Sequence, residues 1–316
     1  MNVQIILSQM LMLFAMMLVG YFVWKKEWMD EAGYQKLSKI VVNILNPILI
    51  VNGVLGKNSQ GNTKLLLQNL AFVCFYYLFL ALIGTVIVWI LRPVKAQRKL
   101  YRLMTIFPNV GFMGIPVITS IFGTESMIYI VFYMLGYNLL LYTYGIVLAK
   151  KAAVDAGNVP MEDDENAGGQ WKRIINAGVI ASIFAVIIFL FQIPVPASVV
   201  TFSDYMGNAT IPLSMMLIGM SIAKADLKTI FSSGRTYLFV AIKMVLIPVG
   251  MTLLLKPLHA DALVFGVFAL QLAMPVGSMV TLIAEESGAD EGCCTNGIVL
   301  STLASIVTIP LVCMFL

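Results

Sequence analysis

Long blocks of apolar residues, separated by short polar loops, make up most of this chain of 316 residues. A membrane-spanning helix needs about 20 apolar residues. The pattern therefore predicts an all-α polytopic membrane protein with ten transmembrane helices. The predicted spans are residues 4–24, 36–56, 65–91, 101–122, 126–149, 173–193, 203–223, 236–255, 261–284 and 293–315.

Two of these spans hold stretches that cannot form an unbroken helix. Phe107–Pro116 contains two prolines and two glycines around Asn109, and Gln271–Ser278 contains Pro275 and Gly277. Proline removes a donor N–H and clashes with the preceding turn, and glycine weakens a helix further. Opened backbone is tolerated in a bilayer only where it is buried in protein or lines a cavity. Both breaks are therefore predicted to mark a site.

The two halves of the chain resemble each other. The interrupted spans are the fourth and the ninth, and Asn43-x-x-x-Pro47 in span 2 is matched by Asn208-x-x-x-Pro212 in span 7. Five spans per half would make the second half enter the membrane from the opposite side, as in the inverted repeats of many transporters. We predict a first repeat at 1–149, a cytoplasmic acidic and glycine-rich linker at 150–172 and a second repeat at 173–316.

The positive charges are distributed unevenly between the loops. Sixteen of the 20 lysines and arginines lie in loops after odd-numbered spans, three lie after even-numbered spans, and Lys243 lies within a span. The positive-inside rule then places the odd loops in the cytoplasm and both termini outside. The loop after span 9 is acidic, but acidic residues contribute little to the rule.

Composition excludes several classes of function. The chain is 60% apolar and only 11% charged, without a basic patch for nucleic acid. Its four cysteines lack metal-ligand spacing, it has one histidine, and no phosphate-binding loop or enzyme constellation occurs, so no cofactor, metal site or catalytic residue is predicted. Embedded carboxylates are nearly absent, which disfavours a proton relay or sodium site built on them. Coupling to H⁺, or to Na⁺ held by carbonyls and amides, stays open.

The breaks themselves are the first candidate binding site. Half-helix N-termini present N–H groups and the positive end of the helix dipole, which favour an anion. The Asn109 amide can donate to a carboxylate, and Gly114, Pro116, Pro275 and Gly277 complete this part of the site. The alternative is a pair of proline kinks with a helix-capping asparagine.

Other embedded polar residues extend the candidate site. Lys243 lies in the middle of span 8, where it can balance an anionic substrate, change protonation during transport, or pair with a backbone carbonyl. Tyr133, Tyr137 and Asn138 lie near one face of span 5. Asn46 and Asn52 in span 2 can line a substrate path or hold helices together. For Asn43 and Asn208, which lie near prolines, we favour a structural role, because an amide can bond to backbone groups that the proline leaves open.

These residues resemble the auxin efflux carrier family, which includes plant PIN-type auxin transporters and bacterial permeases for malate- and malonate-like acids. Asn109 with Met113-Gly114-Ile115-Pro116 is similar to the family's Asn-Thr-Leu-Val-Met-Gly-Ile-Pro element. Gln271–Ala284 is similar to the ninth-helix segment, and Lys243 and Pro248 fall where plant members carry Arg and Pro.

The resemblance implies a structure and a mechanism. It implies two inverted five-helix repeats, with a scaffold of spans 1, 2, 6 and 7, a mobile bundle of the others, and broken helices 4 and 9 that cross at their prolines. It also implies elevator-type motion in a homodimer, with Asn109 as the asparagine that binds the substrate carboxylate. The compact chain is similar to the bacterial branch, which implies a bacterial inner-membrane protein.

The sequence thus predicts a secondary active transporter of a small organic anion, such as a mono- or dicarboxylate, working without ATP. The rival interpretations are a sodium-coupled bile-acid-type symporter, whose crossed-helix fold is related, and an ion/proton antiporter. A membrane-embedded enzyme and a channel are further rivals, and the absence of an embedded nucleophile, His or carboxylate cluster speaks against the enzyme.

Overall fold

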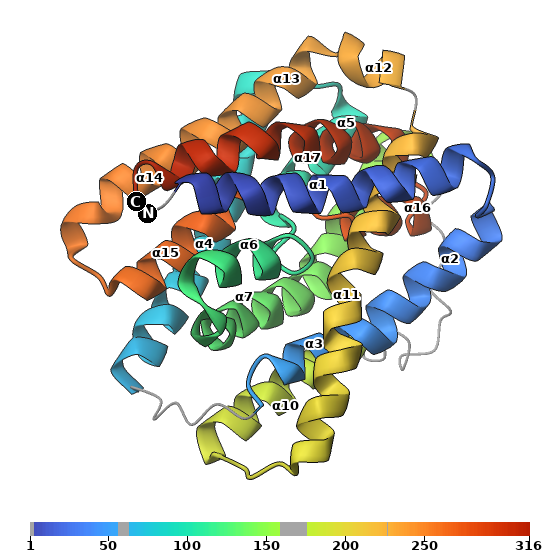
Figure 1. Cartoon of the computed structure of the whole chain (residues 1–316). Helices are drawn as coiled ribbons and strands as arrows, with labels where there is room; N and C mark the ends of the chain where they lie inside the picture. The colour runs from blue at the N-terminus through green and yellow to red at the C-terminus, as the bar shows by residue number, and fades with distance from the viewer. Residues whose placement is uncertain (1–2, 56–62, 159–175, 226) are drawn as a thin grey trace, which may run out of the picture.

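The computed structural model describes residues 3–55, 63–158, 176–225 and 227–316 as a bundle of helices (Figure 1). Within these ranges every regular element is helical and no strand forms. The expected all-α architecture is therefore confirmed for the described part of the chain.

The first half of the chain contains helices in each of its five predicted spans. In spans 2 and 5 the α-helix is interrupted by a five-residue π-helical turn, at Val41–Leu45 and Leu141–Gly145 respectively. The α-helices are α1 (Val3–Lys25), α2 (Glu31–Ile40), α3 (Asn46–Asn52), α4 (Thr63–Leu91), α5 (Lys95–Ile106), α6 (Gly114–Phe122), α7 (Met127–Leu140) and α8 (Ile146–Asp155).

The second half also has helices in each of its five predicted spans. A third π-helical turn, Ile242–Leu246, carries Lys243 and precedes Pro248. The α-helices are α10 (Ala177–Phe191), α11 (Ala197–Lys224), α12 (Leu227–Ser232), α13 (Gly234–Ala241), α14 (Ile247–Leu255), α15 (Ala262–Ala273), α16 (Met279–Glu286) and α17 (Glu291–Cys313).

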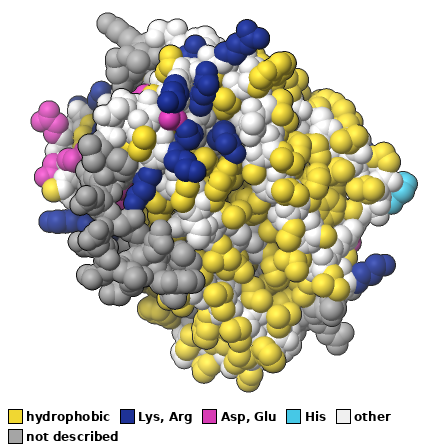
Figure 2. All heavy atoms as spheres, turned by 180° about the vertical axis from the view of Figure 1, so that it is seen from behind, with side chains coloured by type: hydrophobic (Ala, Val, Ile, Leu, Met, Phe, Trp, Pro, Cys, Tyr) yellow, Lys and Arg dark blue, Asp and Glu magenta, His cyan; other side chains and the backbone are white. Residues whose placement is uncertain are grey.

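Six helical stretches of the described chain are long and apolar enough to cross a membrane. They fall on predicted spans 1, 3, 5, 7, 8 and 10, and two shorter apolar helices, α10 and α15, lie in spans 6 and 9. Figure 2 shows hydrophobic side chains over much of one face, with several lysines and arginines gathered in one area. Such a surface suits lipid, because lipid does not oppose exposed apolar side chains.

Both predicted breaks are present. The α5 helix ends at Ile106, before Pro108, and α6 begins at Gly114, while α15 ends at Ala273 and α16 begins at Met279. A residue before proline is pushed out of the helical region, and both Phe107 and Met274 are non-helical. Pro116 does not break a helix. It lies in the first turn of α6, where the missing N–H costs nothing.

The matched prolines of spans 2 and 7 have different surroundings. Pro47 follows a π-helical turn and lies at the start of α3, whereas Pro212 lies inside the continuous helix α11. The similarity between Asn43–Pro47 and Asn208–Pro212 therefore does not produce the same local structure.

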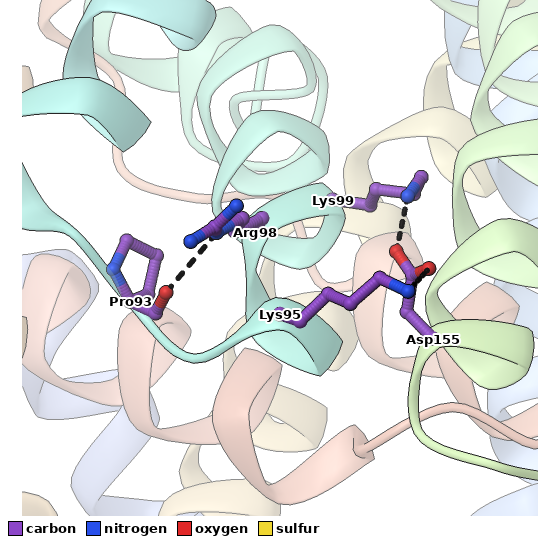
Figure 3. Close-up of polar contacts among 5 residues, drawn as sticks. All are labelled: Pro93, Lys95, Arg98, Lys99 and Asp155. Atoms are coloured by element: carbon purple, nitrogen blue, oxygen red, sulfur yellow. Dashed lines mark hydrogen bonds and ion pairs between the residues drawn. The ribbon is translucent and has the colours of Figure 1, made fainter.

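The α8 helix reaches into the predicted linker and ends at Asp155. The Asp155 carboxylate pairs with Lys99 and, at 3.5 Å, with Lys95, and both lysines lie in the first turns of α5 (Figure 3). Arg98 of the same helix donates to the Pro93 carbonyl at 3.3 Å. The two ion pairs hold the end of α8 against α5, and residues 159–172 of the predicted linker lie outside the described residues.

The α1 and α11 helices pack closely against each other. A β-carbon added to Gly20 would overlap the Met216 carbonyl, and one added to Gly219 would overlap the Met17 carbonyl. Small residues allow such approach of helix backbones in membranes, where packing drives helix association.

We expect Gly219→Ala to lower the melting temperature of the purified protein, because the α1 and α11 backbones must separate, at a cost of about 1–3 kcal/mol. Gly250→Ala is the matched control, since nothing lies within 4 Å of a β-carbon there. A thermal unfolding series in detergent measures both, and equal melting temperatures for the two variants would contradict the close packing.

Candidate functional site

The two helix breaks pair with each other through their backbones. The Asn109 N–H donates to the Pro275 carbonyl at 2.7 Å, and the Gly277 N–H donates to the Phe107 carbonyl at 2.9 Å. Pro108 and Val276 thereby form an antiparallel bridge, and we call this junction the crossing. Each break satisfies backbone groups that the other leaves open, which is what an apolar environment requires.

Side chains from neighbouring helices hold the crossing in place. Gln271 is fully buried, and its Nε2 donates to the Val110 carbonyl at 3.4 Å. The Val276 N–H donates to Ser301 Oγ of α17 at 3.0 Å, and Tyr76 of α4 donates to the Gln271 carbonyl at 3.1 Å. Sequence reasoning did not select Gln271. Its signal was an amide in an apolar helix one turn before the break.

Lys243 lies behind the crossing. The side chain is only 2% exposed, and Nζ donates to the Met274 carbonyl at 2.7 Å. Met274 follows the last residue of α15, so the ammonium faces the negative end of that helix. Among the described residues Lys243 forms no ion pair. Its observed contact is the pairing with a backbone carbonyl, one of the three roles considered for it.

A cavity opens in front of the crossing, with about 620 Å³ of space free of atoms that includes open solvent at its mouth. We call it the crossing cavity. Its polar lining consists of amide and hydroxyl groups, and no lysine, arginine, histidine or carboxylate is among the described residues that line it. The amides and hydroxyls belong to Asn43, Asn46, Asn109, Asn138, Asn176, Tyr137, Tyr142 and Ser278.

The structure divides the predicted site residues into two groups. Asn109, Gly277, Tyr137, Asn138 and Asn46 line the crossing cavity. Six others do not: Gly114, Pro116, Tyr133, Pro275, Lys243 and Asn52.

Three of the residues outside the lining have specific neighbours. Gly114 lies against the Gln271 amide, Asn52 lies against Gly207 of α11, and the Tyr133 ring packs on Tyr76 at 5.2 Å between centroids. The cavity also includes Asn43, Tyr142, Asn176 and Ser278, which were not selected from the sequence. Asn176 and Ser278 stand at helix starts, where a polar residue is ordinary and gives no signal, whereas Asn43 and Tyr142 lie in the π-helical turns within spans 2 and 5.

The crossing side of the cavity offers hydrogen-bond donors. The lining N–H groups of Gly111, Phe112, Ser278 and Met279 have no acceptor among the described residues. Asn109 is 6% exposed, its Oδ1 accepts from the Met113 N–H at 3.4 Å, and its Nδ2 donor has no partner there. The α16 helix starts at this point, so its positive end faces the cavity. This arrangement suits an anion.

A larger cleft, with about 1,820 Å³ of empty volume, joins the crossing cavity to the loops after odd-numbered spans. We call it the access cleft. The two spaces share Val42, Phe112, Ser278 and Met279, so they adjoin each other.

The charged groups of the access cleft lie at its outer part. Lys224 Nζ pairs with Glu31 at 2.6 Å and stands over the Tyr34 ring, 4.5 Å from its centroid. The hydrogen bond from Lys224 lowers the pKa of the Glu31 carboxyl, while burial raises the pKa of Glu285. With Glu291, the described residues of the outer cleft contribute three carboxylates and one ammonium.

The sequence matches the model of one protein family, described as membrane transport protein, over residues 5–313. The chain belongs to this membrane transport protein family. The resemblance to auxin efflux carriers is confirmed at the level of the family, and the chain is a multi-pass membrane transporter. The bacterial malate and malonate branch stays a prediction.

Relatives in this family match along nearly their whole length. The chain is 25% identical to an uncharacterized transporter of Methanothermobacter thermautotrophicus over 304 residues, covering 94% of this chain and 93% of the relative. It is 20% identical to the uncharacterized transporter YfdV of Escherichia coli over 312 residues, 96% of each chain. A third uncharacterized transporter, from Methanocaldococcus jannaschii, is 24% identical over 317 residues, covering 95% of this chain and 96% of the relative.

The close contact between the two breaks leaves little room for a side chain at Gly277. A β-carbon there would lie 3.0 Å from the Phe107 carbonyl oxygen and 2.8 Å from the Tyr137 hydroxyl. We expect Gly277→Ala to push the breaks apart and to lower the melting temperature, with a cost of about 1–3 kcal/mol.

Gly111→Ala is the matched control for this variant. Its added β-carbon meets only the flexible end of Met134, at 3.2 Å. We expect the control to unfold at nearly the wild-type temperature in the same detergent series. A Gly277→Ala protein as stable as the control would contradict the tight pairing.

Proposed function

We propose that this transporter carries a small organic anion whose carboxylate binds at the crossing. The observation that carries the proposal is a group of donors without acceptors among the described residues, the N–H groups of four residues that line the crossing cavity together with Asn109 Nδ2. Donors fixed in a site poor in water bind an anion without having to be reoriented. The amide and hydroxyl groups around them can fix the rest of a small substrate.

The architecture proposed for transport has ten spans in two inverted repeats, 1–149 and 173–316. Three features support it: breaks at corresponding places, five spans on each side of the linker, and the family membership. Contacts link α1, α3, α10 and α11 to one another, in keeping with a scaffold of spans 1, 2, 6 and 7. The crossing cavity lies between residues of that group and the breaks.

On this proposal the broken helices move against the scaffold and carry the substrate by elevator-type alternating access. The access cleft opens toward the loops rich in lysine and arginine, so the present conformation faces the cytoplasm. The proposed setting is the bacterial inner membrane, with both termini outside and with two copies forming a homodimer.

The rival function is a sodium-coupled bile-acid-type symporter or an ion/proton antiporter. Uptake into vesicles, measured against sodium at fixed pH and against pH at fixed sodium, separates these cases. A strict sodium requirement favours the symporter, and ion exchange without any carboxylate favours the antiporter.

Asn109→Ala tests the site directly. We expect the affinity for a carboxylate, found by a thermal-shift screen of small acids, to fall by about 10- to 100-fold while the protein stays folded, because a charge-assisted hydrogen bond is lost. Asn158→Ala is the control, since Asn158 is exposed and donates to the Gly288 carbonyl, outside the cavity lining. Unchanged affinity in Asn109→Ala would remove the crossing as the carboxylate site.

Lys243→Met tests whether the ammonium behind the crossing acts on the substrate by its charge. We expect the variant to bind a carboxylate several-fold more weakly, by roughly 1 kcal/mol, and to bind the matching neutral amide nearly as before. Isothermal titration with both ligands measures the difference. An equal loss for both ligands would instead assign Lys243 to holding the Met274 carbonyl.

A further inference from the structure

The crossing cavity has two polar ends of different chemical character. The crossing end, at Asn109 and Ser278, presents donors. The other end lies at the start of α10, where Asn138 Nδ2 would be 2.9 Å from a β-carbon on Gly178. A ligand that fills the cavity must therefore match the hydrogen-bond donors at the crossing end and also the polar groups at the α10 end.

The crossing end suits a single negative charge. Its unpartnered groups are backbone N–H groups and one amide Nδ2, all of which donate. One ammonium, that of Lys243, stands behind it on the Met274 carbonyl. Tyr137 is 8% exposed, and its hydroxyl has no partner among the described residues, so it adds one more buried group that can donate.

The α10 end offers neutral groups that both donate and accept. The Asn138 amide has no partner among the described residues, and Asn46 Oδ1 is buried without one. Tyr142 contributes a hydroxyl, and Asn176 caps α10 by accepting from the Gly178 N–H at 2.9 Å. A buried acceptor such as Asn46 Oδ1 requires a donor from the ligand or from water.

A second carboxylate fits this end poorly. It would lose its hydration, no cationic side chain stands among the described residues of the lining to replace it, and it would present only acceptors to the buried Asn46 Oδ1. The access cleft adds to this bias, because its described lining holds three carboxylates, those of Glu31, Glu285 and Glu291, against the one ammonium of Lys224. Repulsion from an acidic cleft grows with the charge of the ligand.

We infer that the crossing cavity selects a monocarboxylate that carries a neutral hydrogen-bonding group, an amide or hydroxyl, at its far end, and discriminates against dicarboxylates. This inference rests on the proposed function, that the crossing binds a carboxylate. It narrows the substrate class to one charge at the crossing and one neutral polar group at Asn138 and Asn46.

The test compares four ligands of nearly equal shape by isothermal titration, at a pH where succinate carries two charges. Succinamate has one carboxylate and one amide, succinate has two carboxylates, 4-methylpentanoate replaces the amide with an apolar isostere, and succinamide is neutral. We expect succinamate to bind about tenfold more tightly than succinate and 4-methylpentanoate, and succinamide to bind most weakly.

The titrations distinguish a failure of this inference from a failure of the proposed function. Succinate or 4-methylpentanoate binding as tightly as succinamate would overturn the inference and leave the carboxylate site intact. Succinamide binding as tightly as succinamate, or no binding by any of the three carboxylates, would overturn the proposed function as well.

The Asn138→Leu variant tests whether the preference for succinamate over 4-methylpentanoate arises at the α10 end. We expect it to bind succinamate about tenfold more weakly and 4-methylpentanoate at least as tightly as before, because the amide partner is replaced by an apolar side chain. Tyr142→Phe, which removes only a hydroxyl, gives a second measurement if Asn138→Leu fails to fold, and Asn158→Ala is the control for both. An undiminished preference for succinamate in both cavity variants would overturn the assignment.

Discussion

The structure depends on the two backbone hydrogen bonds that join the helix breaks, from Asn109 to Pro275 and from Gly277 to Phe107. An opened helix in an apolar environment exposes polar groups that cost several kcal/mol each when unpaired. Two breaks placed side by side compensate each other, because each supplies a partner for a group that the other leaves open. The next N–H groups, those of Gly111, Phe112, Ser278 and Met279, have no acceptor among the described residues and belong to residues that line the cavity. Stability and a binding site therefore have one cause.

Much of this arrangement could be predicted from particular residues, and some of it could not. Pro108 and Pro275 determine where the helices stop, because the restriction is local to the proline and its neighbour. The pairing of the breaks is a contact between residues about 170 positions apart, and only the family resemblance indicated it. Helical spacing put Tyr133 and Tyr137 near one face, yet Tyr133 packs on Tyr76 while Tyr137 reaches Gly277. Spacing fixes the face of a helix, and the neighbouring helix decides which side chain reaches a cavity.

Lys243 illustrates the same limit from another direction. Its position in an apolar span showed that it needed a polar partner, since an embedded charge is costly. The sequence left three roles open: balancing an anionic substrate, changing protonation during transport, or pairing with a backbone carbonyl. The choice of the Met274 carbonyl follows from α15 ending where the span-8 π-helical turn passes, a tertiary fact that no local pattern encodes.

The positions of these charges bear on how a loaded transporter could cross the membrane. Lys243 is bonded to the break itself, so on the proposed elevator motion it travels with the substrate. If its ammonium keeps its charge, a bound monocarboxylate makes the moving pair neutral, whereas a dicarboxylate leaves one net negative charge. The membrane potential acts on net charge, at about 2.3 kcal/mol per elementary charge for each 100 mV. A neutral loaded unit moves without that work, while the empty unit, with one positive charge, is driven toward the negative side. A single negative charge on the substrate is therefore favoured twice, at equilibrium by the neutral groups of the α10 end and in transit by the one ammonium at the crossing.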